Sequence, residues 1–530
     1  MHLKLHLTKQ NLVGNQLTLK SINFGDVDAK NEILKNSRTG DRTFFDSYSI
    51  PERIDIEKYL NGERYFILGL KGTRKTALLR YLHDKVTREG DHSELILFKT
   101  HVTEEDRQKL SASAGYQIVS VNYVSAFIQD FKEPWKWFLY QKIAAKLRDT
   151  GYNDALSIKL YKLTGLTENK IGGAIGAMFS KLSSGTLKFS GDALGIALEL
   201  GVEIVSSSGD TGKASLSDIN RACSEILKNL EQRQNLYVFF DELELFYQTQ
   251  EQFNRDRRII RDLIYAISHI NAESAEYGRR IFLISSLRTE VLHSVLELGH
   301  EIGRDVDDYG DRLDWSSSTD GPEHPLLKIV ARKIAVSSET EVDDVWNKFF
   351  PEKINNQDYF KFILNSSYYR PRDIVRLLRV ARDYNNESDS FTTAHFDQTS
   401  LEYSRQTWLE ITEELLASYR PEQIAALQRF FLGFSTHFRR NDIEQRATIK
   451  YKNDIEINEL FNKRDISRTL SDLYRIGVLG NDFVVKNNMG KVNHRNRWVF
   501  RGNTTLNDAE RMTIHKSLWK HLSMVPGSAT

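Results

Sequence analysis

The chain has 530 residues, with 73 Lys and Arg against 72 Asp and Glu and a formal net charge of +1. Hydrophobic residues make up 40% and charged residues 27%, which is ordinary for a globular protein and excludes wholesale disorder. Eight prolines and thirty glycines exclude collagen-like and Pro/Gly-rich chains. One cysteine, Cys223, excludes an internal disulfide and a cysteine-based zinc site.

The N-terminus and the apolar runs bear on the location of the protein. Residues 1–17 alternate charged and apolar side chains and lack the apolar core of a signal peptide. No stretch approaches the roughly 18–20 uninterrupted apolar residues that a membrane-spanning helix needs. We therefore expect a cytoplasmic protein with no membrane partner.

A strand, a glycine-containing turn and a helix are predicted at 65–86, after a short helix capped by Asp28. The turn is close to the phosphate-binding pattern G-x-x-x-x-G-K-[ST], in which backbone N–H groups and a helix N-terminus surround phosphates. Lys75 is expected to reach the β- and γ-phosphates of ATP, with a catalytic role, and Thr76 to bind Mg²⁺. The predicted nucleotide-binding residues of this segment are Gly69, Lys71, Gly72, Thr73, Arg74, Lys75, Thr76 and Ala77.

Arg74 departs from the pattern, because it stands where the second glycine belongs. A bulky side chain there predicts backbone strain or a blocked approach to phosphate, and it argues against turnover more than against the fold. The alternatives are that Arg74 points outward or adds a cation beside the phosphates. The whole segment also has a plainer interpretation, as a turn with basic residues.

A second apolar strand, Tyr237–Phe240, ends in two acids. Asp241 is expected to hold Mg²⁺, and Glu242 to polarise the attacking water as a general base. The alternative is a strand followed by solvated acids. The order of the two motifs along the chain, loop first and acids second, makes chance agreement less frequent.

Two further segments carry polar groups that a nucleotide site needs. The strand at 281–288 ends in Ser285, Ser286 and Arg288, at the edge where parallel α/β sheets bind ligands, so Ser286 is expected at the nucleotide. The alternative is that the serines cap the next helix. Later, Arg370-Pro371-Arg372-Asp373 opens a helix, and Arg370 or Arg372 is expected to reach the nucleotide, with Arg372 as the candidate site residue. The alternative is that Arg372 and Asp373 form surface ion pairs.

The alternation of apolar strands and helices predicts an α/β protein with a parallel sheet, built as a P-loop NTPase core. A helical lid and a winged-helix-like C-terminal domain are expected to follow it. The predicted division is an N-terminal arm and motif at 1–40, an ATPase core at 41–320 with a Gly/Ser-rich insert at 171–212, a helical lid at 321–415 and the C-terminal domain at 416–530.

These motifs together resemble the ASCE division of P-loop ATPases, nearest the AAA+ and STAND-like ATPases. More narrowly, they resemble a group of prokaryotic P-loop ATPases often encoded among mobile and antiphage-defence genes. The resemblance covers roughly residues 20–522. It rests on Phe24-Gly25-x-x-Asp28-Ala29-x-x-Glu32, the loop from Gly69 to Leu78, the Arg370–Asp373 motif and the C-terminal end. It implies ATP with Mg²⁺ as cofactor, and a ring or dimer, since the family often needs an arginine from a neighbouring subunit.

The C-terminal region has a local basic bias with interleaved acids, and 466–475 is a candidate recognition-type helix. It is expected either to bind DNA through phosphate contacts or to pack on a partner or on the ATPase core. The leading functional hypothesis is an ATP-driven switch or regulatory subunit in a prokaryotic, antiphage defence system, working with a separate effector protein. The alternatives are a non-hydrolysing nucleotide-binding scaffold or sensor, and a DNA-handling ATPase.

Overall fold

The structure is a computed structural model. It describes residues 17–40, 42–112, 114–121, 124–166, 195–196, 199–200, 215–245, 249–298, 302–315, 321–486 and 492–527. Most of the insert predicted at 171–212 lies outside these residues. The chain divides into two compact units. The first comprises Met1–Ser49, Trp315–Trp408 and His515–Met524, and the second Ile50–Asp314, Leu409–Ile514 and Val525–Thr530.

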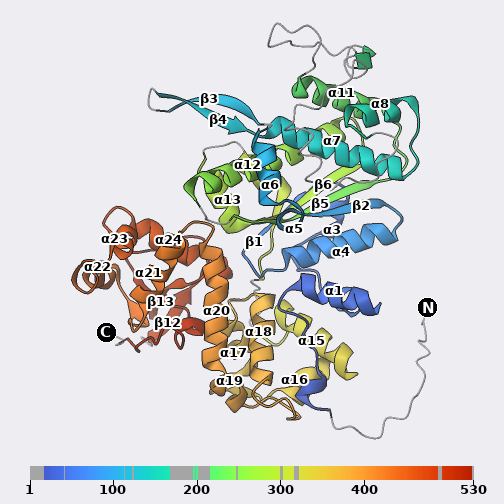
Figure 1. The fold of residues 1–530 in the computed structure, drawn as a ribbon. Coiled ribbons are helices and arrows are strands. Elements are labelled where there is room, and N and C mark those ends of the chain that lie inside the picture. The colour runs from blue at the N-terminus through green and yellow to red at the C-terminus, as the bar shows by residue number, and fades with distance from the viewer. Residues whose placement is uncertain are drawn as a thin grey trace. The chain divides into compact units, whose positions relative to one another are not determined.

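A five-stranded parallel sheet forms the centre of the second unit (Figure 1). Its strands pair in the order β2-β5-β6-β1-β7, and every pair is parallel. Parallel strands are usually covered on both faces, and the apolar residues of β1 and β5 are accordingly buried. This confirms the predicted α/β class with a parallel sheet. The strands are β1 (Phe66–Gly69), β2 (His92–Leu97), β5 (Leu236–Leu243), β6 (Ile281–Arg288) and β7 (Gly310–Arg312).

Helices cover both faces of this sheet. Helix α4 (Lys75–Arg88) contacts four of the strands, while α7 (Lys132–Asp149) and α12 (Gln250–Glu276) pack on the opposite face (Figure 1). The other helices of this region are α3 (Ile56–Leu60), α5 (Phe98–His101), α6 (Glu104–Ala112), α8 (Ala155–Leu163), α11 (Leu216–Asn229), α13 (Thr289–Leu296) and α14 (Ile302–Tyr309). An antiparallel hairpin, β3 (Gly115–Val121) and β4 (Val124–Asp130), projects from the upper left in Figure 1.

The helical segment that follows β4 is divided into two helices, α7 and α8. Helix α7 ends at Asp149, and Gly151 follows with a φ of 82°, which a residue with a side chain rarely adopts. Asp154 then accepts hydrogen bonds from the backbone N–H groups of Leu156 and Ser157 and so starts α8. The local signals that break the helix are therefore a glycine and a capping aspartate.

The first unit is mainly helical. Asp28 caps α1 by accepting a hydrogen bond from the backbone N–H of Lys30, as the sequence predicts. The described elements of the first unit are η1 (Leu19–Ser21), α1 (Ala29–Thr39), α2 (Thr43–Asp46), α15 (Pro325–Ser338), η2 (Val342–Asp344), α16 (Val345–Phe349), β8 (Lys353–Ile354), β9 (Gln357–Asp358), α17 (Tyr359–Ser366), α18 (Pro371–Arg382), α19 (Thr393–Gln398), the start of α20 (Ser400–Leu415) and η4 (Lys516–Leu518).

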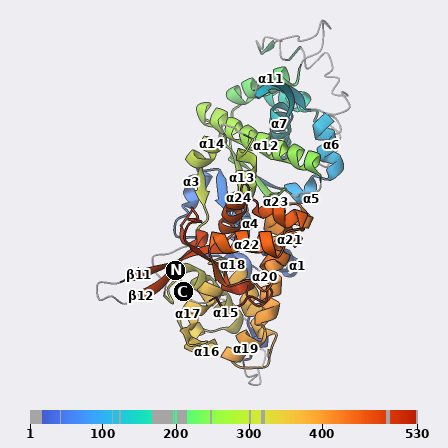
Figure 2. The same cartoon turned by 90° about the vertical axis from the view of Figure 1, so that its left-hand side faces the viewer.

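The C-terminal part of the second unit combines four helices with a small antiparallel sheet of order β10-β13-β11-β12. Strands β11 and β12 form an antiparallel hairpin that extends away from the helices in Figure 2. The elements are α21 (Pro421–Phe431), β10 (His437–Phe438), α22 (Arg440–Ile449), α23 (Ile455–Phe461), α24 (Ile466–Arg475), β11 (Leu479–Lys486), β12 (Val492–Arg497), η3 (Val499–Arg501) and β13 (Arg511–Ile514).

Within the described ranges, no helix has both the length and the apolar character that crossing a bilayer requires.

Candidate functional site

The predicted phosphate loop lies between β1 and α4, and its glycines meet local steric demands. A Cβ atom added at Gly69 would lie 2.5 Å from the Oγ1 atom of Thr73, so this position excludes a side chain. Thr73 is buried and donates a hydrogen bond of 2.8 Å to the carbonyl of Leu70, which closes the turn. Gly72 has a φ of 82°. This arrangement of strand, tight loop and helix fits a P-loop core.

Arg74 takes the backbone conformation that the pattern reserves for glycine. It has φ 69° and ψ 33°, in the left-handed region, and stands at the N-cap of α4. An arginine in this conformation costs about 1–2 kcal/mol relative to glycine. The strain that the sequence predicts is therefore present, and the loop keeps its shape in spite of it.

Two lysines of the loop are buried and held by oxygen atoms. The Lys75 ammonium donates hydrogen bonds of 2.8 Å to the carbonyls of Gly69 and Leu70. The Lys71 ammonium, with 5% of its side chain exposed, lies 3.0 Å from a carboxylate oxygen of Glu410 and also binds Glu413. Both cations thus lie inside the loop that is predicted to bind phosphate. Thr76, half-buried, and Ala77, buried, follow in the first turn of α4.

Asp241 ends the apolar part of β5 at the same sheet edge as the loop, because β1 and β5 run parallel on either side of β6. The side chain is buried, and its Oδ1 atom accepts a hydrogen bond of 2.5 Å from Ser286. Its Oδ2 atom is buried and receives no hydrogen bond from the described residues. A buried carboxylate oxygen without a partner is costly unless a cation completes it.

Mg²⁺ fits this donor set, since it prefers hard oxygen ligands and usually binds through one or two protein groups plus phosphates and water. Asp241 and Thr76 are the residues that would hold it. Across the described residues there is no cluster of three or more His, Cys, Asp or Glu side chains suited to a metal ion.

Glu242 follows in an irregular stretch of β5. The register between β5 and β6 shifts between Phe240 and Leu243, and Glu242 has a φ of 61°. Such irregularities re-aim a side chain at the end of a strand. The Glu242 carboxylate accepts a hydrogen bond of 2.6 Å from the hydroxyl of Thr100, which follows β2. Thr100 therefore fixes the orientation of the predicted general base.

The polar end of β6 serves the acids and does not cap the next helix. Arg288, not a serine, is the N-cap of α13, and no side-chain cap is formed there. Ser286 bonds Asp241, as above, and the Arg288 guanidinium binds Glu244. Glu244 also accepts a hydrogen bond of 3.0 Å from Lys99. The capping interpretation of the two serines is therefore wrong.

Arg372 lies in the first unit, where the structure brings it to the N-terminal motif. Its guanidinium donates a hydrogen bond of 3.2 Å to the carbonyl of Val27 and lies 3.6 Å from Asp28. Asp373, next to it, forms a buried ion pair with Arg376. The two motifs at 24–32 and 370–373 are thus parts of one cluster. A role of Arg372 at the nucleotide stays a prediction.

The candidate recognition helix, α24, has its arginines next to acids. Arg468 lies 3.4 Å from Glu297, which follows α13 in the same unit, and Arg475 lies 2.8 Å from Asp472. Asp472 in turn accepts a hydrogen bond of 2.7 Å from the hydroxyl of Tyr419, and burial raises its pKa. These contacts favour packing on the core as the role of this helix face.

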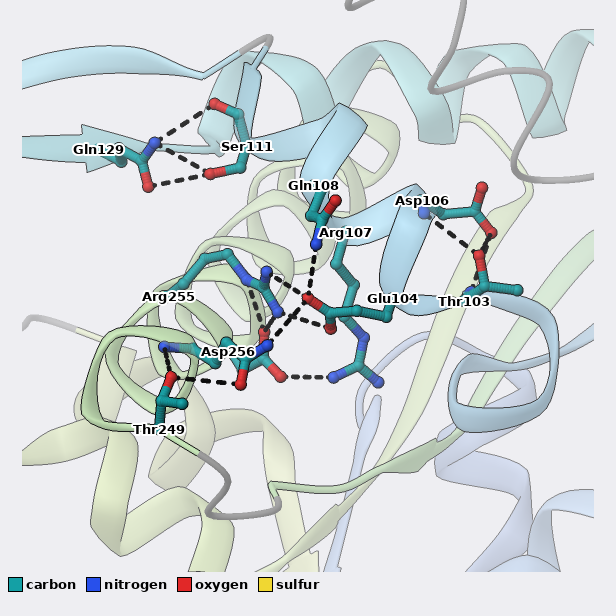
Figure 3. A network of polar contacts seen from close by, with 11 residues as sticks. Thr103, Glu104, Asp106, Arg107, Gln108, Ser111, Gln129, Thr249, Arg255 and Asp256 are labelled. Atoms are coloured by element: carbon teal, nitrogen blue, oxygen red, sulfur yellow. Dashed lines mark hydrogen bonds and ion pairs between the residues drawn. The ribbon is translucent and has the colours of Figure 1, made fainter.

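A second polar cluster joins α6 and α12 (Figure 3). Arg255 forms two hydrogen bonds to Glu104, of 2.8 and 2.9 Å, and also binds Asp256. Arg107 pairs with the same aspartate. These four charges are thus satisfied by one another, and the cluster ties the two helices together.

Sequence reasoning missed three contributors to the site: Thr100, Glu410 and Glu413. Thr100 follows β2, so the rule that ligands bind at the carboxyl ends of parallel strands is a signal that could have found it. The two glutamates lie more than 300 residues from Lys71, and no local pattern links them to it.

Comparisons with known proteins give a partial match. The family described as the FunZ-associated C-terminal helical domain matches residues 324–412, which comprise α15 to α19 and most of α20. No curated protein matches the chain. Among solved structures, the chain is similar to the Aeropyrum pernix ORC1 protein in complex with DNA, at 14% identity and a TM-score of 0.31, over 90% of this chain and 93% of that one. A likeness this low supports no argument about function. The family match therefore characterises the helical segment alone.

Proposed function

We propose that the chain binds ATP with Mg²⁺ at the edge of the sheet formed by the 69–76 loop and the end of β5, and that it works as an ATP-driven switch. One observation carries the proposal. The loop holds two buried lysines, and the same sheet edge holds a buried aspartate with one oxygen that receives no hydrogen bond from the described residues. Cations for phosphate and an incomplete ligand for Mg²⁺ are what a nucleoside triphosphate site requires.

The proposed roles follow from the positions of the side chains. Lys75 binds the β- and γ-phosphates, and the backbone N–H groups of the loop surround them. Bound Mg²⁺ would neutralise phosphate charge, with Asp241 and Thr76 as its protein ligands. Glu242 orients and deprotonates water, and Thr100 holds the Glu242 carboxylate in place. Ser286 keeps Asp241 oriented.

A second candidate, a nucleotide-binding switch that turns over slowly or not at all, is favoured by Arg74. Its left-handed backbone places a long cationic side chain at the N-cap of α4, where the usual glycine lets the loop approach phosphate closely. The two candidates share the binding step and differ in hydrolysis.

The wider setting extends the proposal. We infer a regulatory subunit in a prokaryotic, antiphage defence system that acts with a separate effector protein, possesses a winged-helix-like C-terminal domain and forms a homo-oligomer. The motif resemblance supports this setting. The acids beside Arg468 and Arg475 favour a packing role over DNA binding for α24. Exposed Arg495 and Arg497 on β12 are the residues that a DNA-binding role would use.

The test is the hydrolysis and binding of ATP by purified full-length protein. Wild type is compared with Glu242→Gln, which keeps shape and removes the base, and with Glu89→Gln, an exposed acid on the surface near the end of α4, as the matched control. A true ATPase loses turnover only in Glu242→Gln while ATP binding persists. Binding without turnover in wild type favours the second candidate, and absence of ATP binding contradicts both.

A further inference from the structure

Helix α20 presents an acidic face to the phosphate loop. Glu410 and Glu413 both bind the ammonium of Lys71, one at 3.0 Å. Glu414, which is 2% exposed, lines the same cavity as Leu70. Residues at i, i+3 and i+4 share one face of a helix, so the three carboxylates form a single acidic surface beside the loop.

Glu410 and Glu413 bind the Lys71 ammonium, which a bound phosphate group would otherwise contact. Lys71 is 5% exposed, so its ammonium has exchanged water for the two carboxylates. A nucleoside triphosphate brings up to four negative charges to the same loop. Its phosphates therefore compete with Glu410 and Glu413 for Lys71, and they meet the repulsion of the carboxylates at short range.

The exposure of the two partners makes the contact exchangeable. The side chain of Glu410 is 16% exposed, whereas that of Glu413 is 58% exposed. An exposed carboxylate recovers its hydration when it leaves a lysine, so its release costs little free energy. A contact meant only to hold the fold together would bury both partners, as Glu32 and Lys333 do elsewhere in the chain.

We propose that Glu410 and Glu413 form an anionic latch on the phosphate loop, which nucleotide phosphates displace from Lys71. The proposal rests on the nucleotide site proposed above and adds its regulation. Helix α20 runs without a break from Ser400 to Leu415, and its first residues belong to the segment matched by the helical-domain family. Displacement of its last turns by phosphate gives the bound nucleotide a direct effect on that helix.

The experiment measures binding of a fluorescent ATP analogue, with Mg²⁺, to the full chain. The variants are Glu413→Gln, the double variant Glu410→Gln/Glu413→Gln, and Glu422→Gln. Glu422 is an exposed acid on the neighbouring helix α21, so it controls for the change in net charge. Binding to the double variant is expected to be roughly five- to tenfold tighter than to wild type, that to Glu413→Gln intermediate and that to Glu422→Gln unchanged.

A second readout follows the latch itself. Amide hydrogen exchange of residues 410–415 in wild type is expected to speed up when the ATP analogue binds, because the helix end loses its contact with the loop. Glu413→Gln changes an exposed side chain and keeps the test valid if the double variant does not fold.

The outcomes separate the latch from the nucleotide site. If wild type binds the ATP analogue, and Glu413→Gln and the double variant bind it no more tightly than wild type does, the latch is overturned and the nucleotide site is retained. Unchanged exchange at 410–415 on binding also overturns it. Absence of binding in wild type and in every variant overturns the latch and the proposed function together.

Discussion

The two motif-bearing clusters of the chain differ in how their charged side chains are satisfied. In the first unit, Glu32 pairs with Lys333 and Asp373 with Arg376, and all four side chains are buried. At the phosphate-loop edge of the second unit, Asp241 has a buried oxygen that receives no hydrogen bond from the described residues. The two first-unit carboxylates therefore each have a cationic partner, whereas one oxygen of the Asp241 carboxylate has no hydrogen-bond donor among the described residues.

Left-handed backbone conformations are present at both clusters. Arg74 and Glu242 have them at the phosphate-loop edge, and Tyr368 and Tyr369 have them just before the Arg370–Asp373 motif. Each costs about 1–3 kcal/mol and persists only where the surrounding structure enforces it. Backbone strain therefore does not distinguish the two clusters, whereas the buried carboxylates do. We expect the buried ion pairs of the first unit to be needed for stability and the phosphate-loop edge to bind a ligand.

The largest expected effect is on stability, at the buried Glu32–Lys333 ion pair of the first unit. Lys333→Met leaves Glu32 charged and buried, and is expected to lower the free energy of unfolding by about 3–5 kcal/mol. Chemical denaturation measures it. The double variant Glu32→Gln/Lys333→Met, which removes both charges, should recover most of the loss. If the free energy of unfolding of the single variant falls by less than about 1 kcal/mol, the pair does not stabilise the fold as expected.

The next largest effect concerns Asp241 at the phosphate-loop edge. Asp241→Asn keeps the hydrogen bond from Ser286 and removes the charge that Mg²⁺ needs. We expect stability to change little and the affinity for ATP in the presence of Mg²⁺ to fall about tenfold or more. Titrations with and without Mg²⁺ test this. If Mg²⁺ enhances ATP binding by the variant as much as by wild type, Asp241 is not a ligand.

A partly buried lysine in the first unit, Lys516, gives a pH-dependent prediction. Burial lowers the pKa of Lys516 from 10.5 to about 8, and its ammonium lies 5.1 Å from the ring centre of Phe362. Between these pH values the unfolded chain holds a proton that the folded chain has lost, so this group makes stability rise with pH across that window. Near pH 7 both states hold it, and the folded state bears the full cost of burying the charge.

Lys516→Met is therefore expected to stabilise the protein by about 1–2 kcal/mol near pH 7, a gain that shrinks as the pH rises toward 10.5. Thermal or chemical unfolding of both proteins at several pH values measures the difference. A gain that is constant across this range would contradict the assignment to Lys516.

The smallest expected effect is at Arg74. Arg74→Gly relieves the left-handed strain and raises the free energy of unfolding by about 0.5–1 kcal/mol, after the larger entropy of the unfolded glycine chain is subtracted. Arg74→Ala keeps a Cβ atom and should gain almost nothing. Equal gains from both substitutions would show that the arginine side chain, not the backbone, is the source of the cost.

The sequence predicts the elements with local signals well. The strand and loop before α4, the acids that end β5 and the cap at Asp28 all appear where their patterns place them. What could not be predicted depends on tertiary contact. The pairing of Lys71 with Glu410 joins distant segments, and the left-handed backbone of Glu242 follows from a register shift against β6.

ATP binding at the 69–76 loop is tested most directly by a calorimetric titration of ATP with Mg²⁺ into the full chain. Wild type is compared with Lys75→Ala and Lys85→Ala. Both lysines lie on α4, but Lys85 pairs with Glu89 at the other end of the helix. We expect wild type and Lys85→Ala to bind one ATP per chain and Lys75→Ala to show no detectable binding. Binding of equal strength by all three proteins, or by none of them, would contradict this expectation.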